Sequence, residues 1–206
     1  HQQTQGEGGE DNWQSFMQHV KVLTQYGALE SDSLMLTPLG QAVAEVRGDN
    51  ELWLAAALLQ VSVCVGLTAP ELAALVSALL CPETLNKDFM HCTWGPSPQV
   101  TQAVVDIEPA RMRLQALQED AGIFSEVAID LRLAGLVEAW ASGVEWVDVM
   151  ESTNLDEGDV VRVLRRTADF LTQIKCSSGF SGSIMKNASD AAKLIDRPPI
   201  SDLLIN

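Results

Sequence analysis

The clearest periodic pattern of apolar and polar residues lies between Asp156 and Ile174. Apolar or small side chains recur there at intervals of three and four residues, which places them on one face of an α-helix. The acidic residues at its start suit the positive end of a helix dipole. The pattern predicts a helix that begins at Asn154 or Asp156 and buries the following residues: Val160, Val163, Leu164, Thr167, Phe170, Leu171 and Ile174.

Similar patterns, bounded by capping residues, glycine and proline, predict the other elements. Pro109 is expected to kink or split one long helix. Residues 28–36 predict a small hairpin, and one interpretation of 122–129 is an extended stretch. The other expected helices span about 13–26, 38–46, 51–65, 69–81, 99–119, 131–141, 145–150 and 184–195.

These elements predict an all-α fold, a multi-helix bundle of about seven to eight helices with at most one short β-hairpin near residues 28–36. Residues 1–11 are polar and predict a disordered linker, and 12–204 predict a single helical domain with loops at 83–97 and 177–183. The start at His1 is interpreted as a cut within a longer protein.

The composition supports a helical core and limits the class of partner. Hydrophobic residues make up 47% of the chain and aromatic residues only 5%, a balance that favours helices over a β-sandwich. The net charge of −15 argues against a general nucleic-acid coat, although a narrow basic stripe remains compatible with it. The apolar run from Leu52 to Leu67 is shorter than the roughly 20 residues of a membrane span, so no membrane association is expected.

The cysteines favour free thiols in a reducing intracellular compartment, because they form no CxxC pair. They are Cys64, Cys81, Cys92 and Cys176. A zinc site built from His91, Cys92 and Cys81 is the alternative, but a structural zinc site usually needs four ligands.

The polar face of the helix 156–174 carries Arg162, Arg165 and Arg166, three of the 13 basic residues of the chain. Arg166 and Asp169 are three positions apart and can form an ion pair. The simplest interpretation is therefore a solvated helix face. A row of arginines is also what a single-stranded nucleic acid requires, because guanidinium groups pair with phosphates and stack on bases.

Catalytic motifs do not emerge from the sequence: it contains no phosphate-binding loop, HExxH, GxSxG or kinase motif. Acidic pairs such as Asp148 and Glu151 fit solvated helix faces better than general acid–base pairs. Trp140 and Trp146 are expected in the bundle core, whereas Trp94 is the better candidate for an exposed aromatic side chain.

Several segments, in this order, resemble the C-terminal DSHCT domain of Ski-/Mtr-type superfamily II DExH RNA helicases. The resemblance covers roughly residues 20–204 and is nearest to the plant-chloroplast and cyanobacterial branch, the Increased Size Exclusion Limit type. The matching segments are LTPLGQAVAEVRGDNELWLAAAL (36–58), APELAALVSALLC (69–81), GLVEAWASGVEWVDVM (135–150), DEGDVVRVLRRTADFLTQI (156–174) and DRPPISDLL (196–204).

The resemblance implies a helical accessory domain that packs on two RecA-like motor domains and contacts single-stranded RNA through one "ratchet" helix. The family's RNA-contacting positions fall on Arg166 and Asp169. Arg162 and Arg165 are added to these positions because helical geometry places them on the same face. At Asp169 the sequence departs from the family, which usually has Glu there.

In such a parent helicase ATP and Mg²⁺ belong to the motor domains, so no cofactor is expected in this segment. The branch further implies a chloroplast location and possible protein adaptors. The alternative hypothesis is an all-α protein-interaction module, whose acidic surface docks a basic partner without contacting RNA.

Overall fold

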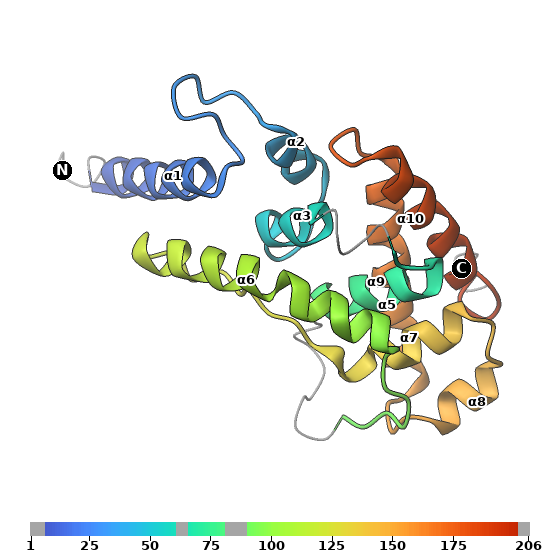
Figure 1. The fold of residues 1–206 in the computed structure, drawn as a ribbon. Coiled ribbons are helices and arrows are strands. Elements are labelled where there is room, and N and C mark those ends of the chain that lie inside the picture. Colours follow the sequence, from blue (N-terminus) through green and yellow to red (C-terminus); the bar gives the residue numbers. More distant parts are fainter. Residues whose placement is uncertain (1–6, 61–65, 81–89, 202–206) are drawn as a thin grey trace.

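The computed structural model describes residues 7–60, 66–80 and 90–201. These residues form a helical bundle with nine α-helices, one short 3-10 helix and no β-strand (Figure 1). The predicted all-α class is confirmed. The elements are α1 (Glu7–Tyr26), α2 (Pro38–Glu45), α3 (Glu51–Leu59), α5 (Ala69–Leu80), α6 (Pro98–Asp120), η1 (Leu131–Leu133), α7 (Ala134–Ala141), α8 (Trp146–Glu151), α9 (Glu157–Cys176) and α10 (Gly182–Ile195).

Helix α5 is the centre of the bundle and packs against α6, α7, α9 and α10. Every residue from Leu72 to Leu80 is buried, as expected for a helix that is apolar on all sides. Its one polar side chain in that stretch, Ser77, donates a hydrogen bond to the carbonyl of Ala74 at 2.8 Å and is thereby satisfied. None of the helices in the described ranges is long and apolar enough to cross a membrane.

Helix α1 begins at Glu7, six residues before the predicted start at Trp13, so the expected linker 1–11 is helical from Glu7 onward. The helix extends away from the bundle, and its last turn rests on α6 (Figure 1). There the Tyr26 hydroxyl donates to the carbonyl of Ala110 at 3.1 Å. The apolar side chains near its start lie in solvent, and Trp13 is 64% exposed.

The hairpin expected at 28–36 is reduced to one isolated bridge between Leu29 and Leu36. The backbone N–H of Glu30 donates to the carbonyl of Met35 at 2.9 Å, and that of Thr37 donates to the carbonyl of Ala28 at 3.1 Å. Side-chain hydrogen bonds in the turn add to these backbone bonds. The Ser33 hydroxyl donates to Glu30 at 2.7 Å and accepts from the backbone N–H of Met35 at 3.3 Å.

Helix α6 is continuous through Pro109 from Pro98 to Asp120, so of the two predicted outcomes, a kink or a split, the split does not occur. Proline removes the hydrogen bond to the carbonyl four residues earlier, which belongs to Val105. Val105 is 59% exposed, so solvent can satisfy that carbonyl.

The segment 121–130 contains no helix or strand and is held by side chains from neighbouring helices. The Trp53 indole donates to the carbonyl of Ala128 at 3.1 Å, and the Asn50 amide donates to that of Glu126 at 3.2 Å. Asn50 also caps α3, which ends at Leu59; residues 61–65 of the longer expected helix lie outside the described ranges.

The expected surface loop 83–97 is described only from residue 90 onward. There Cys92 forms an isolated bridge with Thr153. Trp94 is half-buried against the core, so the expectation of an exposed aromatic side chain at this position was wrong. Trp140 is buried as predicted, and Trp146 packs edge-on against it at 5.5 Å between ring centroids.

The turn between α9 and α10 is anchored to α2 by Glu45. Its carboxylate accepts from the Ser177 hydroxyl at 2.5 Å and from the backbone N–H groups of Ser178 and Gly179 at 2.7 and 3.2 Å. Side-chain hydrogen bonds from Ser177, Ser178 and Gln41, that from Ser177 first, lower the pKa of Glu45 to about 2. A Cβ at position 179 would overlap the backbone of Ala42, which explains glycine at this close approach. The sequence pattern suggested a flexible loop at 177–183, whereas α2 holds its first residues in place.

Candidate nucleic-acid interface

The predicted orientation of α9 is confirmed: all seven residues assigned to its apolar face are buried. Asp156 caps the helix by accepting from the backbone N–H of Asp159 at 2.8 Å. The polar face therefore points away from the core along the whole helix.

A cleft of about 560 Å³ separates this polar face from the connection between α2 and α3. All four predicted contact residues line it, and one further basic residue lies on its opposite side. Its charged lining residues are Arg162, Arg165, Arg166 and Asp169 from α9, and Arg47 from the α2–α3 connection. Four guanidinium groups and one carboxylate thus share a single cleft on a chain of net charge −15.

Arg166 pairs with Asp49 across the cleft and not with Asp169, so the predicted ion pair within the helix was wrong. The reason is tertiary: the backbone N–H of Arg47 donates to the Gln173 amide oxygen at 2.7 Å, which holds the connection against α9. Asp49 then lies within reach of Arg166, whose side chain is 36% exposed.

The other two arginines of α9 differ in their exposure. Arg162 is 58% exposed and pairs with Asp159 at 2.6 Å within the helix. Arg165 is half-buried, and one of its terminal nitrogens donates to the carbonyl of Ile200 at 3.4 Å. Its Nε is buried and has no hydrogen-bond partner among the described residues.

The sequence did not indicate Arg47, which lines the cleft, or Asp49, which pairs with Arg166. They lie more than a hundred positions before α9 and are isolated in a segment without basic clustering. Their role depends on the packing of the α2–α3 connection against α9, for which the sequence offers no local signal.

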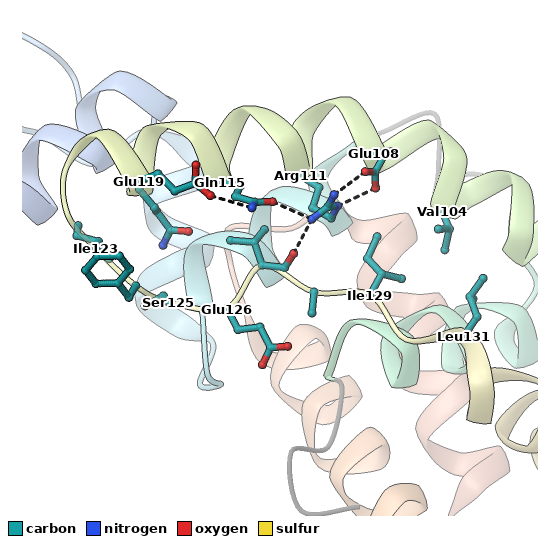
Figure 2. A pocket seen from close by; sticks show the side chains of 14 residues that line it. Val104, Glu108, Arg111, Gln115, Glu119, Ile123, Ser125, Glu126, Ile129 and Leu131 are labelled. Atoms are coloured by element: carbon teal, nitrogen blue, oxygen red, sulfur yellow. Dashed lines mark hydrogen bonds and ion pairs between the residues drawn. The ribbon is translucent and has the colours of Figure 1, made fainter. Parts of the chain in front are cut away.

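A second cavity of about 770 Å³ lies between α6 and the segment 121–131 (Figure 2). Most of its polar residues form a row along α6, and Ser125 and Glu126 lie on the facing segment. In the row, Arg111 donates to both carboxylate oxygens of Glu108 and to the carbonyl of Val127. The hydrogen bond from Arg111 lowers the pKa of Glu108. Phe124, at the edge of this cavity, is 95% exposed.

The possible metal ligands do not converge within the described ranges. Cys92 and Cys176 are free thiols, and the Cys92 sulfur lies 3.8 Å from the Ser152 hydroxyl. Among the described residues no three or more His, Cys, Asp or Glu side chains could hold a metal ion together. Cys64 and Cys81 lie outside the described residues, so the zinc hypothesis stays untested at Cys81.

The cleft beside α9 is the described surface best suited to a polyanion. Its guanidinium groups can bind phosphate oxygens bidentately, and their flat faces can stack on bases. The Asp169 carboxylate is exposed in the same cleft and can accept hydrogen bonds from base amino groups.

Comparison with known proteins shows similarity to a domain family and to a plant protein. The model of the DSHCT (NUC185) domain family matches residues 33–202. The "DExH-box ATP-dependent RNA helicase DExH15 chloroplastic" of Arabidopsis thaliana is 36% identical over 193 residues, which are 93% of this chain and 16% of that protein. The chain thus spans about one sixth of the length of this relative.

Proposed function

Because this chain belongs to the DSHCT (NUC185) domain family, we propose that it is the helical accessory domain of an ATP-dependent RNA helicase and binds single-stranded RNA along α9. The observation that carries the proposal is the convergence of four arginines on one cleft of an otherwise acidic chain. The similarity to an Arabidopsis protein named as a DExH-box RNA helicase supports RNA as the polyanion.

In this proposal Arg162 and Arg166 bind consecutive phosphates, because they lie one helical turn apart on the exposed face of α9. Arg47 binds the strand from the opposite wall of the cleft. Asp169 accepts from the exocyclic amino group of a base. The phosphate contacts depend little on sequence, as expected for a domain that accompanies a moving strand, whereas Asp169 can accept only from bases that carry an amino group.

The chemistry of ATP hydrolysis is assigned to RecA-like motor domains elsewhere in a longer chain, with ATP and Mg²⁺ as their cofactors. The residues described here fit a metal poorly, since no three acidic, His or Cys side chains gather in one place. The domain would pack on that motor. Since the Arabidopsis relative is named as chloroplastic, we place the protein in the chloroplast.

The test is RNA binding by the 206-residue chain, measured as fluorescence anisotropy of a labelled single-stranded oligo(U). Arg166→Ala should weaken binding by about tenfold, because a charge-assisted hydrogen bond to phosphate is lost. Circular dichroism should show an unchanged helical content. In a longer helicase that carries this domain, the same change should lower RNA-stimulated ATP hydrolysis.

The matched control is Arg132→Ala on η1, which removes the same charge and also breaks an ion pair, here with Asp130. Arg132 lies outside the cleft, so this variant should bind RNA within about twofold of the wild type. If the wild type and Arg166→Ala bind RNA with equal affinity, the assignment of α9 as the RNA-binding helix is refuted.

A protein-interaction module is the second candidate function, and the cavity along α6 favours it. Phe124 stands almost fully in solvent beside that cavity, as an anchor residue for a partner would. Pull-down with the chain at low and high salt, combined with RNA crosslinking, separates the two functions. A protein retained through the α6 cavity without any crosslink to α9 would support the module.

A further inference from the structure

A second groove, of about 360 Å³, lies on the other side of α9, where α10 packs along it (Figure 1). Arg165 and Asp169 line both the cleft and this groove, so the two hollows meet at those residues. A ligand that leaves the cleft over Arg165 therefore enters the groove directly.

The groove has the side chains that a phosphate requires. Lys175 near the end of α9 and Lys193 near the end of α10 line it, together with the hydroxyl-bearing residues Thr172 and Ser189. Both lysines are exposed. Lys193 is held only by an exposed ion pair with Asp190 at 3.3 Å, which contributes little and is easily exchanged.

Arg165 provides an independent indication at the junction. Its guanidinium has a weak bond to Ile200 at 3.4 Å and a buried Nε without a partner among the described residues. Because the Nε is buried, a ligand in either hollow meets the terminal nitrogens of the guanidinium, and one of these has only the weak bond to Ile200. A phosphate oxygen at the junction would be a stronger acceptor for that nitrogen.

The charge balance also favours an anion. The cleft and the groove together are lined by six basic residues of the 13 in the chain, against the carboxylates of Asp169 and Asp196. Three neighbouring carboxylates each form an ion pair with one of these basic residues: Asp49, Asp159 and Asp190. The cleft alone has four guanidinium groups against one carboxylate, and the groove adds two lysines against Asp196.

We propose that the α9–α10 groove is a second phosphate-binding subsite, which takes the next nucleotides of the RNA strand after it crosses Arg165. This inference rests on the proposed function and extends it from one cleft to a continuous track over both sides of α9. Lys175 and Lys193 bind the phosphates there, and Arg165 binds the phosphate at the junction.

The test compares two double variants of the 206-residue chain with the same change in charge. Lys175→Ala/Lys193→Ala removes the groove lysines. Lys21→Ala/Lys186→Ala removes two exposed lysines on α1 and α10 that line neither hollow. Anisotropy titrations with single-stranded oligo(U) of about three and about fifteen nucleotides, each at several KCl concentrations, give affinities and salt dependence.

We expect the groove variant to bind the longer oligonucleotide about tenfold more weakly than the control variant. The slope of log K against log salt should become shallower by about 1.4, since each lost phosphate contact on a single strand removes about 0.7. With the shorter oligonucleotide, which the cleft alone can hold, the two double variants should agree within about twofold.

The outcomes separate this inference from the proposed function. Suppose that Arg166→Ala weakens binding but the groove variant matches its control in affinity and in salt slope. The groove is then not a subsite, and the proposal that the cleft binds RNA still holds. If neither variant affects binding, both proposals are overturned. A groove variant that loses equal affinity on short and long oligonucleotides also contradicts a track that continues from the cleft.

Discussion

Arg166 has two competing partners in the proposed function: the Asp49 carboxylate in the free chain and a phosphate in the complex. Both are anions with oxygens that suit a guanidinium fork. Asp49 is 57% exposed, so the ion pair is open to solvent and to exchange. The carboxylate therefore keeps the arginine extended across the cleft and must be displaced when a phosphate binds.

Asp49→Asn should raise the affinity for single-stranded oligo(U) by about two- to fivefold, because an exposed ion pair is worth up to about 1 kcal/mol. Anisotropy at low salt measures the gain. Asp148→Asn on α8 makes the same change in charge away from the cleft and should give little increase. The gain should vanish in the Arg166→Ala background; a gain that persists there would exclude competition for Arg166.

Helix α9 illustrates how much of the site can be predicted from the sequence. The alternation of Val, Leu and Phe with Arg was sufficient to identify both its buried and its exposed face, because helical periodicity depends only on local spacing. The partner of Arg166 was not predictable in the same way. Asp49 reaches it through a contact between segments 117 positions apart, and Asp169 was the nearer candidate by spacing alone.

The errors at other elements have the same origin. Helix α6 is not split at Pro109, and Val105, whose carbonyl loses its partner, is exposed, which the sequence pattern did not reveal. Residues 28–36 contain apolar residues suitable for a hairpin, but an isolated bridge and backbone hydrogen bonds join their arms without forming strands. Each case was decided by which groups are exposed or bonded in the folded chain.

Leu75→Ala in α5 should lower the free energy of unfolding by about 3–4 kcal/mol. Leu75 is fully buried in the helix that contacts most of the bundle, so the cavity cannot be filled by solvent or by a nearby loop. Urea unfolding followed by circular dichroism measures the change. Leu194→Ala on α10, where the side chain is 40% exposed, is the matched control and should cost less than about 1 kcal/mol.

The charge of the whole molecule is divided unequally over its surface. The chain has 28 acidic and 13 basic residues, so most of its surface repels a polyanion. Six of the basic residues, however, gather beside α9. Such a distribution favours one orientation of the strand over all others, because phosphates meet attraction only along this helix. The composition argued against a general nucleic-acid coat. The clustering of the basic residues beside one helix agrees with this, because it leaves the rest of the surface acidic.

Stability in acid should depend on Glu45. Its pKa is about 2 in the folded chain against 4.5 for an unperturbed side chain, so the unfolded state binds more protons between these values. The stabilisation by Glu45 is complete above about pH 4.5 and is lost as the pH falls toward 2. In Glu45→Gln this loss should be absent.

Thermal unfolding at intervals between pH 6 and pH 2 tests this expectation in both proteins. The wild type should be the more stable protein at pH 6, and the difference should shrink steadily below about pH 4.5. A difference that stays constant down to pH 2 would show that the carboxylate charge is not what holds the turn after α9.

The three connections between α2 and α9 also affect the energetics of binding. Glu45 fixes the turn after α9, Arg47 is bonded to Gln173, and Asp49 is paired with Arg166. The two walls of the cleft are therefore preorganised before any strand arrives. A ligand then loses only its own freedom and that of a few arginine side chains, because the backbone around the cleft has already been ordered by folding.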